Sequence, residues 1–121
     1  MKVTGITCHV LQAKVDRPFT SARGWVYGTR SSCVVEIATD EGITGWGECY
    51  GPAAVNKALI ETQYAPRVVG RDPFDVEAVW EDLYNRIKDY GAQGFSITAL
   101  SGIDIALWDI MGRAVGKPIH K

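Results

Sequence analysis

The chain has 121 residues, of which 46% are hydrophobic and 22% are charged, a composition typical of a globular domain. Its 13 basic and 14 acidic residues leave a formal net charge of −1, which argues against nucleic acid or an anionic membrane surface as a partner. No apolar run approaches the roughly 20 residues of a membrane span, and the N-terminus lacks the apolar core of a signal peptide. The length fits one domain, or one domain and the start of another.

The first 15 residues alternate between apolar and polar side chains, so residues 3–15 are predicted to form a strand with a bend or bulge near Val10. Residues 16–30 show no periodicity. They combine Pro18 and Gly24 with several aromatic side chains, and we predict a loop that is either mobile or functional.

Alternation returns at Ser32–Thr39, which we predict as the second strand. The sequence Asp40-Glu41-Gly42 predicts a three-residue hairpin turn with glycine at the left-handed position. The returning strand is predicted at Ile43–Glu48, so the first half of the chain should form a three-stranded antiparallel meander.

Helices are predicted after Gly51-Pro52. The first should end before Pro66 and bury a face formed by Val55, Ala58, Leu59 and Thr62. The second should begin with Asp72 as N-cap and Pro73 in the first turn, and should close at Gly91. Its apolar stripe has helical spacing and comprises Val76, Val79, Trp80, Leu83, Ile87 and Tyr90.

The last predicted helix starts at Ala99 and ends at Gly116-Lys117-Pro118. Apolar side chains, including Trp108 and Val115, cover more than half of its circumference. Asp104 falls inside that apolar sector, where we expect a buried, hydrogen-bonded carboxylate. A helix this apolar needs partners on most sides, and we therefore expect the chain to be the front part of a larger protein.

Strands followed by helices predict the α+β class: a three-stranded antiparallel meander followed by a bundle of about three helices.

Three cysteines, Cys8, Cys33 and Cys49, lie far apart and form no CxxC pair. We interpret them as buried free thiols, which favours a reducing, cytoplasmic location. Neither His9 nor His120 has an acidic or histidine partner at metal-ligand spacing.

Three blocks of sequence carry a resemblance to a known family. They are Val34–Glu48 with its Gly-Trp-Gly-Glu ending, Gly70–Pro73, and Ala99–Asp109 followed by Gly116–Pro118. Together they closely resemble the N-terminal capping domain of the enolase superfamily, in the mandelate racemase and muconate-lactonizing branch. The resemblance implies a capping domain at residues 1–118. Residues 119–121 would then start the linker to a (β/α)8 barrel that this chain does not contain.

The family's chemistry is abstraction of a proton α to a carboxylate by a lysine or histidine, with Mg²⁺ stabilising the enediolate. The resemblance implies that the base and the metal ligands belong to the barrel, so no catalytic and no metal-binding residue is expected in this chain. Alone it should be inactive, with Mg²⁺ bound only by the full-length parent. We favour an acid-sugar dehydratase as parent. A racemase, epimerase or cycloisomerase of the same branch remains open, as does a stand-alone binding module.

In the family, the loop after the first strand and the segment after Gly-Glu close over the substrate. Here these are residues 17–30 and 49–52. The resemblance therefore implies the lid residues Phe19, Arg23, Trp25, Tyr27 and Tyr50, with Arg23 available to pair with a second carboxylate or with sugar hydroxyls. Arg30 and Glu48 are interpreted as structural. The expected partners are the barrel domain, a small carboxylate substrate such as a sugar acid, and further copies of the chain in a homo-oligomer.

Overall fold

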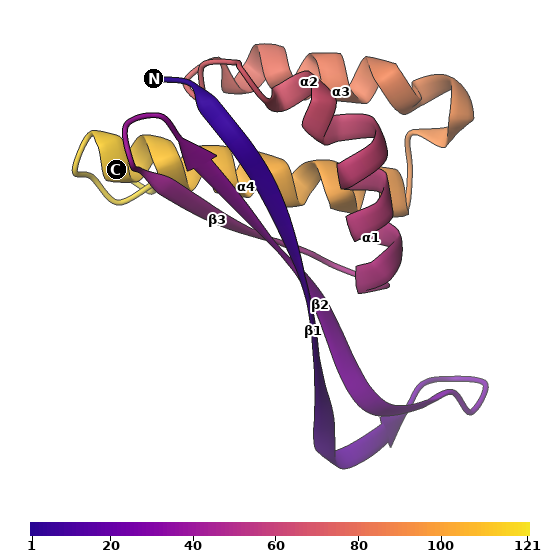
Figure 1. Cartoon of the computed structure of the whole chain (residues 1–121). Helices are drawn as coiled ribbons and strands as arrows, with labels where there is room; N and C mark the ends of the chain where they lie inside the picture. The colour runs from indigo at the N-terminus through magenta and orange to yellow at the C-terminus, as the bar shows by residue number, and fades with distance from the viewer.

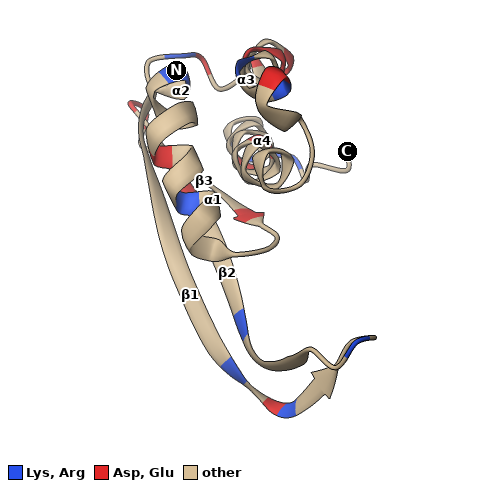
Figure 2. Cartoon of the chain, turned by 90° about the vertical axis from the view of Figure 1, so that its right-hand side faces the viewer, with Lys and Arg blue, Asp and Glu red and all other residues tan.

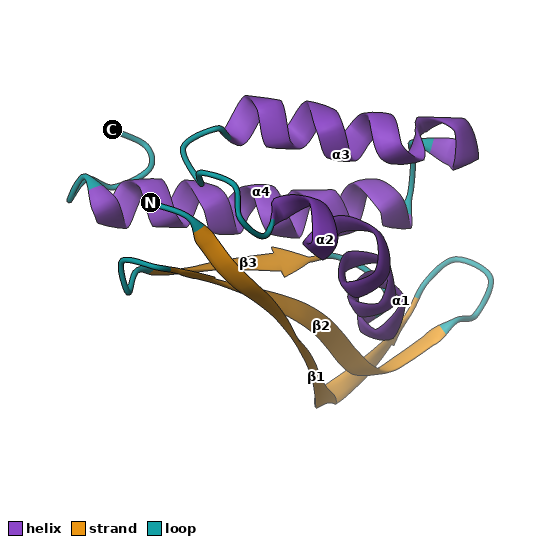
Figure 3. Cartoon of the chain, turned by 45° about the horizontal axis from the view of Figure 1, so that its top comes forward, coloured by secondary structure: helices purple, strands orange, loops and turns teal.

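A three-stranded antiparallel sheet in the order β1-β2-β3 carries all the helices on one face in this computed structural model, which describes all 121 residues (Figures 1 and 3). The predicted α+β class and the order of strands before helices are confirmed. The elements are β1 Val3–Thr20, β2 Val26–Thr39, β3 Thr44–Cys49, α1 Ala53–Leu59, the π-helical turn η1 Ile60–Tyr64, α2 Ala65–Val68, α3 Val76–Gly91 and α4 Phe95–Ala114.

The first two strands are much longer than the alternation predicted, and the expected loop at 16–30 is wrong. Pairing between β1 and β2 continues to Phe19↔Tyr27 and Thr20↔Val26, so only residues 21–25 form the turn. A register slip explains the missing periodicity. From Lys14↔Thr29 to Phe19↔Tyr27, β1 advances five residues while β2 moves two, which inserts a bulge around Pro18. The strand has no irregularity at Val10, where one was predicted.

The turn Asp40-Glu41-Gly42 between β2 and β3 is confirmed, with Gly42 at φ +78°. The sheet's inner face is built from the alternating residues that the sequence suggested. Cys33, Val35 and Ile37 are completely buried beneath the helices. All three cysteines are buried free thiols, as predicted.

Helix α4 lies directly along β3, and glycines make this approach possible. A Cβ at Gly45 would overlap the carbonyl oxygen of Ala106, and one at Gly47 would overlap the carbonyl oxygen of Gly102. A Cβ at Gly102 would in turn overlap the sulfur of Cys49. The backbones of β3 and α4 are therefore in direct contact. A side chain at any of these glycine positions would hold the strand and the helix further apart.

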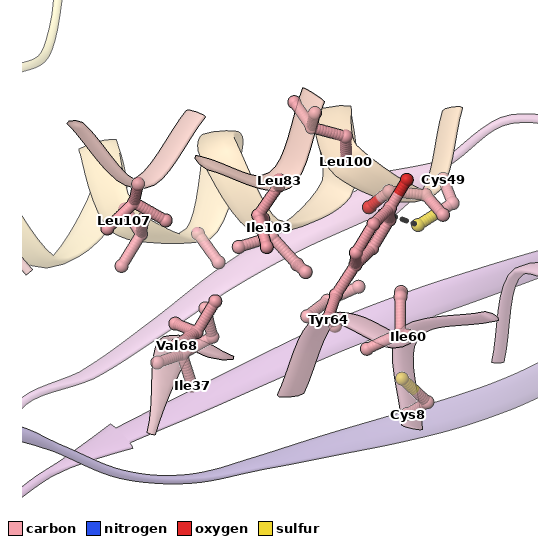
Figure 4. Close-up of a cluster of buried hydrophobic side chains, with 14 of the residues drawn as sticks. Cys8, Ile37, Cys49, Ile60, Tyr64, Val68, Leu83, Leu100, Ile103 and Leu107 are labelled. Atoms are coloured by element: carbon pink, nitrogen blue, oxygen red, sulfur yellow. Dashed lines mark hydrogen bonds between the residues drawn. The ribbon is translucent and has the colours of Figure 1, made fainter. Parts of the chain in front are cut away.

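The buried face of α4 is narrower than the predicted apolar sector. It comprises Ala99, Leu100, Gly102, Ile103, Ala106, Leu107 and Ile110. Figure 4 shows Leu100, Ile103 and Leu107 among them. Trp108 and Val115 were expected inside that sector but are exposed. Asp109 on the flank accepts hydrogen bonds from the backbone N–H of Trp46 at 3.0 Å and from Nε of Arg113 at 2.9 Å. It therefore caps a free N–H on the outer edge of the sheet.

Helix α4 ends as the sequence predicted. Gly116 adopts φ +63°, and the N–H of Lys117 donates back to the carbonyl of Gly112 at 2.9 Å. By length and composition this helix could also cross a membrane. Its contact with β3 and its charged flank identify it instead as a core helix.

The first helical segment buries a different face from the one predicted. Val55 is exposed, and the buried residues are Ala53, Asn56, Ile60, Tyr64 and Val68. The helical path also does not end before Pro66, because the π-helical turn Ile60–Tyr64 precedes the proline and α2 runs through it.

Helix α3 starts later than predicted. Asp72 accepts a hydrogen bond from the N–H of Phe74 at 3.0 Å and so stabilises a separate turn, whereas the helix begins at Val76. Its buried stripe lacks Trp80 and Tyr90, which are exposed; Trp80 stacks on Tyr84 instead.

An arginine–aspartate pair ties α3 to α2. Arg67 donates to both carboxylate oxygens of Asp82, at 2.6 and 3.1 Å, and Arg71 lies 3.4 Å from the same group. The hydrogen bonds from Arg67 lower the pKa of Asp82 below its ordinary value.

Asp104 does not behave as predicted. It lies half-buried in an apolar groove between α3 and α4, beside Trp80, and its carboxylate forms no hydrogen bond. Desolvation in this groove raises its pKa above the ordinary value. The groove is lined mainly by apolar side chains from both helices, and its single side-chain donor, the indole N–H of Trp80, forms no hydrogen bond with the carboxylate.

Replacing Gly47 by alanine should test the backbone contact between β3 and α4. The added methyl group meets main-chain atoms rather than a movable side chain, so we expect a loss of about 3 kcal/mol or more in unfolding free energy. Gly28→Ala is the matched control, because a Cβ there meets nothing within 4 Å. Thermal and urea unfolding followed by circular dichroism would measure both, and equal stabilities would contradict the contact.

Replacing Asp104 by asparagine should stabilise the isolated chain at neutral pH. Because the folded pKa is raised, the folded chain holds the proton more tightly than the unfolded chain, and stability falls as pH rises above the ordinary value of 3.8. Asp104→Asn removes that loss. We expect a higher melting midpoint than wild type at pH 7 and no difference below pH 3.8. Asp89→Asn, at an exposed position of α3, controls for the charge change. A lower midpoint for Asp104→Asn at pH 7 would contradict this account.

Candidate functional site

A two-stranded hairpin arm projects from the sheet (Figure 1). We define the arm as residues 11–32. Strand β3 pairs with β2 only as far as Cys33↔Cys49, so beyond Cys33 the strands β1 and β2 have only each other as partners. A two-stranded hairpin is marginally stable in water without further packing. The stability of the arm therefore depends on contacts among its own side chains and on contacts with any surface that it packs against.

An aromatic–cation stack stiffens the middle of the arm. The rings of Phe19 and Tyr27 are stacked, with centroids 5.0 Å apart and planes 17° apart. The guanidinium carbon of Arg30 lies 4.9 Å from the centroid of Phe19 and 5.5 Å from that of Tyr27. Such contacts restrict an arginine that would otherwise move freely. Arg30 forms no ion pair with any carboxylate of the chain, so its charge remains available.

The tip of the arm is a tight turn. The N–H of Ser21 donates to the carbonyl of Trp25 at 3.0 Å, and the N–H of Gly24 donates to that of Ser21 at 3.1 Å. Arg23 holds φ +77° and is the one non-glycine residue of the chain in the left-handed region. The side chain of Trp25 is 71% exposed.

A hollow of about 700 Å³ lies between the arm and the segment that follows β3. Its lining is rich in hydroxyl groups, with one cation and one carboxylate. The hydroxyl groups belong to Tyr27, Thr29, Ser31, Ser32 and Tyr50. The cation is Arg30 and the carboxylate is Glu48, which accepts a hydrogen bond from Oγ of Ser32 at 2.7 Å. A lining of this kind suits a polar, hydroxylated small molecule.

The segment 49–52 is fixed from below by helices α1 and α4. Buried Asn56 donates to the carbonyl of Tyr50 at 2.9 Å and accepts from Oγ1 of Thr98 at the same distance. Gly51 adopts φ +98° and passes over the ring of Phe95. The exposed ring of Tyr50 is thereby held at the rim of the hollow on an anchored backbone.

The structure brings three of the five predicted lid residues together. Tyr27 and Tyr50 line the hollow, and Phe19 supports it through the stack. Arg23 and Trp25 lie in the turn at the tip, outside the lining.

Sequence reasoning did not select Arg30 for the site. The bulge at Pro18 is what places Phe19 beside Tyr27 and Arg30, and no periodic pattern reveals a bulge of three residues.

Positive charge gathers on the arm although the whole chain is nearly neutral (Figure 2). Residues 11–32 contain four basic residues, Lys14, Arg17, Arg23 and Arg30, against one acidic residue, Asp16. The arm therefore favours an anionic ligand at short range.

The cysteine thiols and the His9 imidazole are the other groups that could take part in chemistry, and they either are unreactive or lie away from the hollow. Burial raises the pKa of Cys8 and of Cys49 to about 12, so these thiols stay protonated and make poor nucleophiles. On the outer face of the sheet, Nε2 of His9 lies 2.7 Å from Oε2 of Glu36, a cross-strand partner that the sequence did not reveal. No group of three or more His, Cys, Asp or Glu side chains lies close enough to hold a metal ion.

The family model of the mandelate racemase / muconate lactonizing enzyme N-terminal domain matches residues 5–121. This chain is a capping domain of the enolase superfamily. It is 46% identical over 119 residues to D-galactarolactone cycloisomerase of Agrobacterium fabrum, covering 98% of this chain and 31% of that protein. It is 38% identical over 108 residues to arabinonate dehydratase of Saccharolobus solfataricus, covering 88% of this chain and 29% of that protein.

Solved structures show the same likeness. The crystal structure of 3,6-anhydro-D-galactonate cycloisomerase from Zobellia galactanivorans matches with a TM-score of 0.82 and 37% identity, covering 95% of this chain and 29% of that one. The capping domain thus spans less than a third of the length of these relatives. The relatives are full-length enzymes of the superfamily, which implies a partner catalytic domain.

Hydrogen exchange should show that the arm is ordered only in part when nothing covers it. We expect the amides of residues 11–20 and 26–32 to exchange well before those of residues 33–38, which pair on both edges. The turn at residues 21–25 should exchange first. Exchange in the arm should slow when the catalytic domain is present, and protection of the isolated arm equal to that of residues 33–38 would contradict this.

Proposed function

We propose that this capping domain closes over the active site of a Mg²⁺-dependent enzyme that abstracts the proton α to the carboxylate of a sugar acid. The observation that carries the proposal is the hydroxyl-lined hollow between the arm and the segment 49–52. It lies in a domain whose relatives are named for sugar acids and their lactones. A polyol chain offers many hydroxyl groups, and this lining offers matching donors and acceptors.

The chain's own residues would bind and orient the substrate and exclude water. Tyr27, Thr29 and Ser31 line the hollow from the arm, and Tyr50 lines it from the opposite rim. Closing such a lid lowers the local dielectric and strengthens the charges that act on the reacting carbon. The lid residues thereby select the end of the substrate that is remote from the reaction.

The proton-abstracting base and the metal belong, in this proposal, to the catalytic domain. Bound Mg²⁺ would stabilise the negative charge that develops on the substrate carboxylate. Mg²⁺ needs several oxygen ligands in octahedral geometry, and the carboxylates of this chain are dispersed. We therefore assign no step through the metal to any residue of the capping domain.

Two outcomes can follow proton abstraction. Loss of a β-hydroxyl group makes a dehydratase, the reaction that the sequence resemblance favoured and that is named for the arabinonate relative. A cycloisomerase is the second candidate, favoured by the 46% identity over 98% of this chain to D-galactarolactone cycloisomerase.

The proposal is tested with the capping domain joined to its catalytic domain, assayed with Mg²⁺ against a panel of sugar acids and their lactones. Proton NMR in D₂O would follow loss of the α-proton, and the product spectrum would separate dehydration from cycloisomerisation. We expect turnover of at least one sugar acid or lactone by the joined protein and none by residues 1–121 alone. Turnover by the isolated domain, or none by the joined protein on the whole panel, would contradict the proposal.

A further inference from the structure

We infer that Arg30 binds a second carboxylate at the far end of the substrate, so that the preferred substrates are sugar diacids or their lactones rather than monoacids. The inference rests on the proposed function and adds the substrate class. It also assigns to Arg30 a role that the family resemblance implied for Arg23.

The position of Arg30 in the hollow is the first support. Arg30 is the one basic residue in the lining, whereas Arg23 lies in the turn at the tip and Arg17 lies at the bulge, both outside it. A guanidinium group presents a planar fork of donors that matches a carboxylate in a bidentate arrangement.

The state of the Arg30 side chain is the second support. Its guanidinium packs over the rings of Phe19 and Tyr27, which limits its conformations without neutralising its charge. The only carboxylate in the lining, that of Glu48, already accepts a hydrogen bond from Ser32 and forms no ion pair with Arg30. An arginine that is held by aromatic rings and lacks an acidic partner is prepared to bind an external anion.

The composition of the hollow supplies the third support. On the same face of β2 as Arg30, the lining offers the hydroxyl group of Ser32, which suits a hydroxylated carbon next to a terminal carboxylate. The net positive charge of the arm adds attraction for a doubly charged substrate over a singly charged one.

The test compares matched substrates in the capping domain joined to its catalytic domain. Each pair consists of an aldarate, with a carboxylate at both ends, and the aldonate of the same configuration, with an alcohol at the far end; galactarate and galactonate form one such pair. We expect wild type to prefer the diacid. Arg30→Gln should lower kcat/KM for the diacid by about 10- to 100-fold and lower that for the monoacid much less, because the lost contact is charge-assisted only with the diacid.

Two further variants separate charge from position. Arg30→Lys keeps the charge and loses the fork, so we expect an intermediate loss on the diacid. Arg17→Gln removes a charge of the arm outside the hollow and should lower the diacid preference far less than Arg30→Gln does. Melting curves of each variant establish that the domain remains folded.

The outcomes separate failure of the role assigned to Arg30 from failure of the proposed capping function. Turnover of monoacids in preference to diacids by wild type, or an equal loss on both members of a pair in Arg30→Gln, would overturn the role of Arg30 and leave the capping function standing. Failure of wild type to turn over either member of any pair, or their lactones, would overturn the proposed function together with this inference.

Discussion

The backbone contact between β3 and α4 is the constraint on which the rest of the domain depends. Gly45 and Gly47 on the strand face Ala106 and Gly102 on the helix with no side chain between them. This contact sets how far the helix layer stands from the sheet. It also brings Asp109 to the free N–H of Trp46, so that this donor on the outer edge of the sheet is paired.

The same contact positions the candidate site. Strand β3 leads directly into the segment 49–52, and α4 supplies the Thr98 hydroxyl that holds Asn56, which in turn holds the carbonyl of Tyr50. One rim of the hollow is therefore rigid. The opposite rim is the arm, which has only two strands and an internal stack of Phe19, Tyr27 and Arg30. A rim anchored on two helices facing a rim of only two strands suits a domain that must admit a substrate and then cover it.

Much of this architecture was predictable from local patterns. The meander, the turn at Gly42 and the termination of α4 at Gly116 all follow from alternation and from glycine in the left-handed region. Two of the errors come from breaks in a regular period. The bulge near Pro18 concealed the outer halves of β1 and β2, and the π-helical turn Ile60–Tyr64 leads into α2, which holds Pro66 in its first turn.

The candidate site was predictable only in outline. The aromatic residues of the arm could be selected because they interrupt a region without periodicity, and Tyr50 because it follows the Gly-Glu motif. Their grouping could not be predicted, because it depends on the register slip that brings Arg30 to Phe19. The prediction of a hydrogen-bonded Asp104 was wrong because it also depended on the three-dimensional arrangement of neighbouring side chains. An acid in an apolar sector implies a partner only if a donor is placed to reach it, and the single side-chain donor of the groove between α3 and α4, the indole N–H of Trp80, forms no hydrogen bond with Asp104.

The most direct test of the central contact is a nuclear Overhauser experiment on the isotope-labelled domain in solution. The structure predicts strong cross-peaks from the α-protons of Gly47 to the amide proton of Ala106, because a Cβ at Gly47 would come within 2.9 Å of that nitrogen. Absence of these cross-peaks in a sample whose α4 amide signals still show a continuous helix would mean that helix and strand do not meet through their backbones, and would contradict the account.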